Sequence, residues 1–153
     1  MNKFELTAEF VTNVFGKKLF RIKALVAFGD VEKGELGGFI EKEDNLSHDD
    51  NAWVYGNARV YGDAWVSGNA RVSGNAWVSG NADYAAVAGF GRYSRTTTFF
   101  RCKDKILRVQ CGCFYGDLAQ FREIVKKTHG DSKYAKEYLS IADLMELHFS
   151  DEY

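Results

Sequence analysis

Three cysteines and one histidine in the last third of the chain are the residues best suited to metal binding or nucleophilic catalysis: Cys102, Cys111, Cys113 and His129. Zinc ligands of this kind are usually paired cysteines two residues apart, whereas only Gly112 separates Cys111 from Cys113. Alternate residues at the end of a β-strand produce the same spacing. We therefore expect free thiols, with no metal and no cofactor. A structural metal site, and a catalytic pair of Cys111 or Cys113 with His129, stay open as alternatives.

A second group of residues could bind an anion. It consists of four arginines that follow closely on one another in the chain: Arg92, Arg95, Arg101 and Arg108. Lys103 and Lys105 lie among them, and Asp104 is the single acidic residue in the segment. A guanidinium fork matches two phosphate oxygens, so a phosphate or nucleotide site needs two or three arginines that converge. Charges in such a segment are typical of a solvated hairpin face. The functional prediction beside it is that the four arginines and His129 contact a ligand or partner.

The composition limits what kind of protein can hold these residues. Among 153 residues there are 20 basic and 21 acidic side chains, so neither bulk nucleic-acid binding nor an acidic decoy surface is expected. The length suits one domain or a short capped repeat array and excludes a large multidomain enzyme. We expect a cytoplasmic protein without a membrane partner, because there is no apolar run of membrane-spanning length and no signal-peptide pattern. An odd number of cysteines agrees with a reducing compartment.

The middle of the chain is a hexapeptide repeat. Between residues 51 and 80 the pattern Asn or Asp, Ala, Trp or Arg, Val, Tyr or Ser, Gly occurs five times. Alternating Ala and Val predict a very short strand with one buried face, and Gly followed by Asn or Asp predicts a turn. A chain that turns the same way after each strand winds into a coil, and three hexapeptides would close one coil. We therefore predict a β-solenoid with Val and Ala inside, and a differently wound or irregular solenoid as the alternative.

The coil geometry also predicts where the outward residues lie. With three hexapeptides in each coil, Trp53 stacks on Arg71, Arg59 on Trp77, and Trp65 on Asp83. The three tryptophans then fall on three faces, so no single aromatic stripe is available for carbohydrate or nucleic acid. We expect stacking of Trp and Arg between coils. The alternative is that exposed Trp53, Trp65 and Trp77 bind a protein partner.

The segments on either side of the repeat predict its caps. Alternating apolar residues before the repeat indicate two or three strands around a turn near Gly16, which would cover one open end. After the repeat, residues 96–102 and 106–111 predict a hairpin. Asp117 with Gln120, and then Gly130, mark the start and end of a helix, and a second helix is expected over 133–148. We divide the chain into a cap (1–38), a solenoid (39–91) and an α+β unit (92–153).

The repeat resembles the hexapeptide-repeat, left-handed parallel β-helix family, in which a small residue follows an aliphatic one by four positions, as Ala58 follows Val54. This resemblance implies a left-handed solenoid of about three coils. Residues 19–25, 28–31, 37–40 and 45–47, leading into the repeat, resemble uncharacterised phage and prophage proteins of this family. The tail around residues 111–114 and 128–131 is similar to a small domain appended to phage and bacterial proteins.

The resemblance and the residues together rank the functions. We predict a non-enzymatic binding protein of phage or prophage type that engages or sequesters a host component, such as a counter-defence inhibitor in the host cytoplasm. Its partner would be a host protein, or else a small anionic ligand or nucleotide, and homo-oligomer formation stays open. The family includes trimeric acyltransferases with a catalytic histidine and a projecting loop, but these repeats contain neither. An acyltransferase and a structural virion component are the alternatives.

Overall fold

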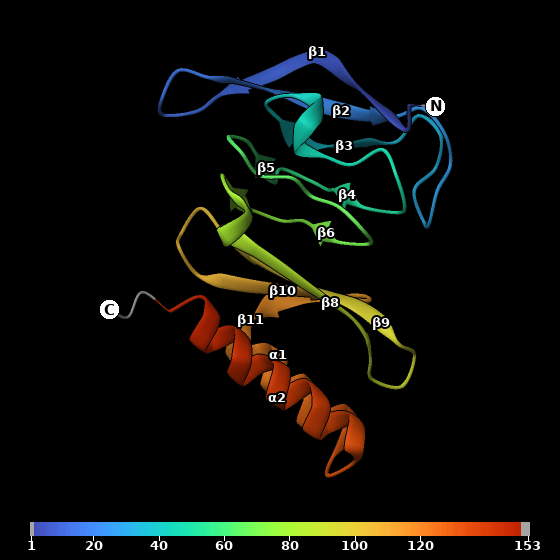
Figure 1. Cartoon of the computed structure of the whole chain (residues 1–153), viewed down its shortest axis with the longest axis vertical. Helices are drawn as coiled ribbons and strands as arrows, with labels where there is room; N and C mark the ends of the chain where they lie inside the picture. The colour runs from blue at the N-terminus through green and yellow to red at the C-terminus, as the bar shows by residue number, and fades with distance from the viewer. Residues whose placement is uncertain (1, 151–153) are drawn as a thin grey trace.

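The computed structural model describes residues 2–150 and stacks three layers along the long axis of the molecule (Figure 1). A hairpin of β1 and β2 lies at one end, short parallel strands fill the middle, and an antiparallel sheet with two helices lies at the other end. The chain is mainly β-structure with two helices. No helix within residues 2–150 is long and apolar enough to cross a membrane.

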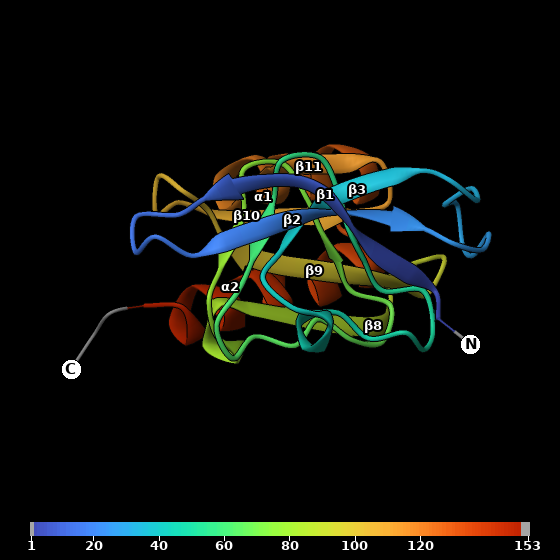
Figure 2. The same ribbon diagram turned by 90° about the horizontal axis from the view of Figure 1, so that it is seen from above.

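The first end is covered by antiparallel strands. β1 (Phe4–Thr12) pairs with β2 (Lys18–Ala24), and β2 pairs with β3 (Leu36–Ile40). Gly16 has a φ of +80° in the predicted turn. Because β3 continues in parallel into the middle layer, the hairpin extends one wall of the stack and crosses over its end (Figure 2).

The middle layer is a β-solenoid of very short strands. They are β4 (Trp53–Val54), β5 (Arg59–Val60), β6 (Arg71–Val72) and β7 (Trp77–Val78). β4 pairs with β6, and β5 pairs with both β3 and β7, always in parallel. Trp53 pairs with Arg71 and Arg59 pairs with Trp77, so the register confirms that every third hexapeptide lies side by side. The pairs β4 with β6 and β3 with β5 and β7 form two walls of the coil, and a parallel bridge between Leu46 and Val66 lies on a third.

The solenoid interior contains the small residues that the repeat predicts. The Ala and Val of each hexapeptide are at most 1% exposed from Ala52 to Val78. Each of the first four turns has a glycine with positive φ, and at Gly62 a Cβ would also lie 2.5 Å from the Ser79 carbonyl oxygen of the next coil. Gly80 is extended instead and precedes the 3-10 helix η2 (Asn81–Asp83). The expected stack of Trp65 on Asp83 is therefore replaced by a bond from the Trp65 amide to Asn81 Oδ1 (2.9 Å).

The far end is closed by a four-stranded antiparallel sheet in the order β11-β10-β9-β8. Its strands are β8 (Tyr84–Phe90), β9 (Arg95–Arg101), β10 (Leu107–Cys111) and β11 (Phe114–Asp117). β9 and β10 confirm the predicted hairpin. The sheet is larger than expected because β8, which the sequence analysis placed at the end of the solenoid, pairs with β9. The predicted boundaries at residues 38 and 91 fall within β3 and between β8 and β9.

Strand β9 joins the two larger layers. Its Phe100 is fully buried in the solenoid core, and its neighbour Phe99, on the opposite face, is fully buried in the core under the helices. The Arg71 amide donates to Thr98 Oγ1 (3.0 Å), and Ala76 forms an antiparallel bridge with Cys102. One strand therefore completes the solenoid and also forms the floor of a second core.

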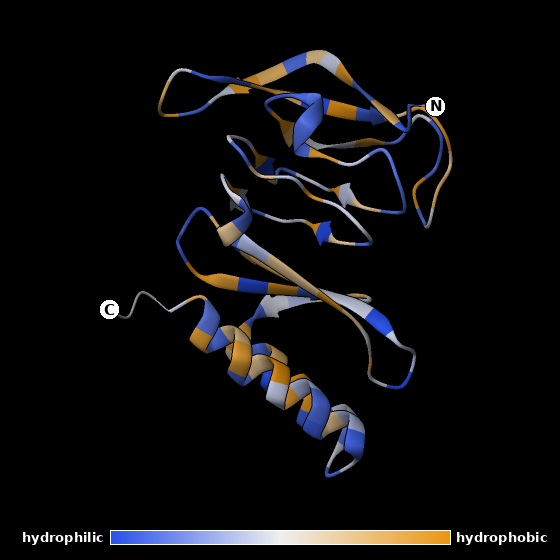
Figure 3. Cartoon of the chain, viewed as in Figure 1, coloured by the Kyte–Doolittle hydropathy of each residue, from blue (hydrophilic) through white to orange (hydrophobic). Residues whose placement is uncertain are grey.

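Two helices cover the face of the sheet that points away from the solenoid (Figure 1). α1 (Leu118–His129) begins with the predicted capping box of Asp117 and Gln120, and α2 (Lys133–His148) begins at Ser132. Both helices carry polar and apolar segments (Figure 3). In the helix expected over 133–148 the apolar pattern predicts that Tyr134 and Leu144 point inward, but they are 37% and 55% exposed. Each precedes a buried residue by one position, and that step turns a side chain by about 100° around the helix.

Candidate functional site

We define the C-terminal unit as strands β8 to β11 with helices α1 and α2. At one end of this unit lies a hollow that is lined by arginine, cysteine and histidine side chains. We call it the arginine cavity, and its volume is about 230 Å³. Three segments form it: the connection from β8 to β9 with the first residue of β9, the turn from β10 to β11 with the adjoining strand ends, and one face of α1 from Phe121 to His129. One side chain from α2 completes the lining. The lining residues are Arg92, Tyr93, Arg95, Cys111, Cys113, Phe114, Phe121, Ile124, Val125, Thr128, His129 and Tyr138.

The end of α1 places an imidazole at the cavity. His129 is the last residue of α1, and the Gly130 amide closes the helix by donating to the Lys126 carbonyl (2.9 Å). The imidazole stacks on the ring of Tyr138 with centroids 5.8 Å apart and an angle of 27° between the planes. Tyr138 thus fixes the position of His129 through ring contact.

The β10–β11 turn packs against the guanidinium of Arg95, the first residue of β9. Cys111 pairs with Phe114, so Gly112 and Cys113 form the turn between the two strands, in which Gly112 has a φ of +57°. A Cβ at Gly112 would collide with Nη1 of Arg95. A glycine is required here twice over, because the backbone is left-handed and because the Arg95 side chain occupies the space of a Cβ.

Two arginines share one tyrosine at the mouth of the cavity. The guanidinium carbons of Arg92 and Arg95 lie 5.7 and 5.1 Å from the centroid of the Tyr93 ring. Within residues 2–150 neither arginine forms an ion pair, and no carboxylate lines the cavity. The nearby Glu137 carboxylate accepts instead from the Gly91 amide (3.2 Å). The mouth therefore carries two guanidinium groups without an ion-pair partner among residues 2–150, although Arg95 also lines a neighbouring hollow that contains Asp30, the partner of Arg71.

The polar groups deeper in the cavity are donors and thiols. Tyr138 donates to the Phe90 carbonyl (3.4 Å), and burial, followed by the neighbouring Cys111, raises the pKa of its phenol to about 12. Cys111 Sγ accepts from Thr97 Oγ1 (3.2 Å), and Cys113 is exposed. Within residues 2–150 no hydrogen bond joins a thiol to His129, so a nucleophile and base pair is not assembled there.

The metal alternative finds no support in the geometry. No three Cys, His, Asp or Glu side chains among residues 2–150 are grouped closely enough to hold a metal ion. Cys102 is buried at the base of the solenoid, where burial raises the pKa of its thiol and the nearby Arg108 guanidinium partly offsets the rise. It lines a different hollow from Cys111 and Cys113.

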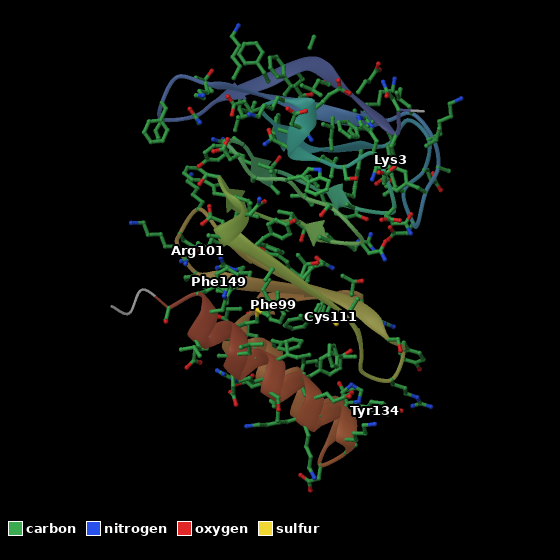
Figure 4. All side chains as sticks on the ribbon, in the orientation of Figure 1. Lys3, Phe99, Arg101, Cys111, Tyr134 and Phe149 are labelled. Carbon is green, nitrogen blue, oxygen red and sulfur yellow. The ribbon has the colours of Figure 1, made fainter. Side chains whose placement is uncertain are left out.

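The other two predicted arginines lie away from the cavity. Arg101 is at the far end of β9, where it contacts the ring and carbonyl oxygen of Phe149 and an oxygen of Asp83 (Figure 4). Arg108 forms a two-bond pair with Asp104 (2.9 Å each), which lowers the pKa of that carboxyl to about 2. The four arginines do not converge because an extended strand of the length of β9 separates its two ends by roughly 20 Å.

The predicted tryptophan surface is also divided. Trp53 is fully buried and packs edge-on against Phe28 at 5.2 Å, so the prediction that it faces outward is wrong. The loop that carries Phe28 covers this face of the coil, and Arg71 stacks on Tyr55 instead (4.8 Å). Trp77 stacks with Arg59 (5.2 Å) as predicted, and Trp65 is 52% exposed.

Sequence reasoning found three lining residues, Arg92, Arg95 and His129, and missed the apolar wall between them. Phe121 and Tyr138 lie on the apolar faces of the two predicted helices, a position typical of core residues. Cys111 and Cys113 were expected to be free thiols, with metal binding and catalysis as the alternatives. The available signal was Gly112: a glycine between two strand-pattern residues marks a tight turn or a close approach.

Comparison with known proteins supports the assignment of the middle layer as a β-solenoid. The family model described as YdcK Beta solenoid repeat matches residues 52–68 and 64–80. No curated protein matches the chain. Both matched segments lie in the solenoid, which supports the description of this layer as a β-solenoid, and neither includes a residue of the arginine cavity.

Proposed function

We propose that this chain is a non-enzymatic binding protein in which the solenoid is a rigid holder and the C-terminal unit captures the ligand or partner. The observation that carries the proposal is the mouth of the arginine cavity, where Arg92 and Arg95 lack ion-pair partners within residues 2–150. Unneutralised guanidinium groups beside an apolar wall favour recognition of an anionic group. Fixed stacking contacts reduce the entropy that binding would cost.

The solenoid contributes stiffness to this function. We propose that it is a left-handed parallel helix of about three coils, a proposal supported by parallel pairing at an interval of three hexapeptides and by the regular turns. The hairpin at one end and β9 at the other cover strand edges that would otherwise invite stacking between molecules. Such a body suits a monovalent binder better than a polymerising one.

The resemblance to phage and prophage proteins suggests the setting. In our proposal the chain is phage-encoded and engages or sequesters a host component in the host cytoplasm, and counter-defence is the sharpest form of that role. The acyltransferase and virion-component alternatives stay predictions. His48, which a coil-based catalyst would need free, is stacked on Phe4 at 4.1 Å, and its Nδ1 accepts from the Lys3 amide (3.0 Å).

A pull-down from bacterial lysate with three forms of the chain tests this function. We expect the native chain and Arg122→Ala to capture the same host component, because Arg122 does not line the cavity and is a half-buried arginine paired with Asp143 and Glu146 on the helices. The double variant Arg92→Ala/Arg95→Ala should capture at least about tenfold less. Equal capture by the double variant, or capture of nothing above background by a folded native chain, would refute the proposal.

A further inference from the structure

We propose that the arginine cavity binds a free small molecule built from one aromatic ring that carries one oxyanion, such as an aryl phosphate or aryl carboxylate. This inference rests on the proposed binding function and names the ligand class for the same site. It joins two halves of the cavity, a cationic mouth and an aromatic wall, that the sequence analysis did not connect.

The mouth recognises the oxyanion. Arg92 and Arg95 approach the same Tyr93 ring, so both guanidinium groups are held close to this one side chain of the cavity lining. Arg95 is further fixed by lying over Gly112. A guanidinium donates two parallel hydrogen bonds to a carboxylate or phosphate, and these charge-assisted bonds are stronger than neutral ones. Because no carboxylate among residues 2–150 lines the cavity, a bound anion meets no competing acidic side chain from the described part of the chain.

The wall recognises the ring. Phe121 is 2% exposed, lies 5.8 Å from Phe114, and meets Tyr138 edge-to-face at 5.8 Å and 86°. Ile124 and Val125 of α1 add aliphatic surface beside these rings. Edge-to-face and offset contacts are the arrangements that aromatic pairs prefer. An incoming ring therefore continues a cluster that already has this geometry.

The volume limits the ligand to about one ring. A dry cavity of about 150 Å³ accepts benzene, and sites for drug-sized ligands usually span about 300 to 1,000 Å³. The arginine cavity, at about 230 Å³, has room for a substituted ring and cannot enclose a whole nucleotide. The apolar wall stabilises a ligand only by removing apolar surface from water, so it contributes binding free energy to an aromatic ring and little to a sugar or an inorganic anion.

Calorimetric titration of the full chain with four probes tests the two halves separately. Phenyl phosphate and benzoate carry both features, inorganic phosphate carries only the oxyanion, and benzyl alcohol carries only the ring. We expect phenyl phosphate or benzoate to bind at least about tenfold more tightly than either single-feature probe. The preferred one of the two identifies the oxyanion. Raising the salt concentration should weaken binding, because part of the affinity is electrostatic.

Variants locate the site. Arg92→Ala and Arg95→Ala should each weaken binding of the preferred probe by at least about tenfold, whereas Arg122→Ala should leave it unchanged. Ile124→Ser removes apolar surface at a position that is 37% exposed, so it should fold normally and weaken binding severalfold. Thermal unfolding of each variant separates a loss of the site from a loss of the fold.

Three results would overturn the inference. They are equal affinity for inorganic phosphate and the preferred aryl probe, equal affinity for benzyl alcohol and the preferred aryl probe, and no binding of either aryl probe by a folded chain at millimolar concentration. Each of these can occur while host capture still depends on Arg92 and Arg95, in which case the proposed function stands and only the ligand class fails.

Discussion

The solenoid and the C-terminal unit enclose their cores with different kinds of side chain. The solenoid uses Ala and Val at every inward position of its repeats, all nearly inaccessible, and its turns repeat with nearly the same backbone geometry. The C-terminal unit uses large rings from four segments, and between these rings it leaves the arginine cavity. The repeat places the same small residues in the same contacts in every coil, whereas the rings of the C-terminal unit come from separate elements and leave a hollow between them. The comparison indicates that the repeat supplies shape and that the irregular unit supplies the site.

Among the substitutions considered, replacement of Phe100, which lies between the two regions, should change the free energy of unfolding most. Phe100→Ala empties a fully buried position between β9 and the last coil, which should lower the free energy of unfolding by about 3–5 kcal/mol. Phe90→Ala is the matched control, because Phe90 is 40% exposed on β8 and should cost about 1 kcal/mol or less.

Urea unfolding can follow each region separately. All three tryptophans lie in the solenoid and both helices lie in the C-terminal unit, so fluorescence reports one and far-ultraviolet circular dichroism the other. The two transitions should coincide in the native chain and separate in Phe100→Ala. A loss below about 1.5 kcal/mol with coincident transitions would show that β9 does not join the two cores.

The contrast between a regular repeat and an irregular unit also determines which features could be predicted from the sequence. The solenoid was predictable because every hexapeptide repeats the same evidence, and the pairing of Trp53 with Arg71 followed from counting alone. The helix ends were predictable because capping is a local property, as at Asp117. The burial of Trp53 under Phe28 was not, because it depends on how distant segments pack. The separation of Arg95 from Arg101 could have been foreseen, because the predicted strand over residues 96–102 is long enough to keep its two ends apart.

The next prediction measures how tightly the coils constrain one another. Gly62 and Gly68 occupy the same place in the repeat and have φ values of +63° and +64°. A Cβ at Gly62 would meet the Ser79 carbonyl oxygen, whereas none of the described atoms lies within 4 Å of one at Gly68. Gly68→Ala should cost about 1–2 kcal/mol from the left-handed backbone alone, and Gly62→Ala about 1–2 kcal/mol more.

Chemical denaturation of the two variants checks that difference. Because the backbone cost is common to both variants, the difference between them isolates the contact between coils. Equal losses would mean that the Ser79 segment moves aside without cost, and the solenoid would then be less rigid than the proposed function requires.

The smallest expected effect concerns buried charge, which the two regions also handle differently. The arginines of the cavity are at its mouth, but Lys3, at the capped end of the solenoid, is 4% exposed and donates to the Ala52 carbonyl (2.7 Å). Burial lowers the pKa of Lys3 to about 8, with Asp50 and Asp49 partly opposing the shift. Between about pH 8 and 10.5 the unfolded chain therefore binds more protons at Lys3 than the folded chain does.

The sign of the pH dependence follows from that proton difference. Stability should rise as the pH increases through about 8, by up to about 1 kcal/mol between pH 7 and 9, and this rise should be absent in Lys3→Met. Cys102 acts in the opposite direction, because burial raises the pKa of its thiol, but it is present in both proteins and cancels in their difference. Measuring the free energy of unfolding of both proteins from pH 7 to 9 gives that difference. If this difference does not change with pH, the charged form of Lys3 is as stable beside the Ala52 carbonyl as it is in water. Burial of this charge at the end of the solenoid would then have no measurable cost.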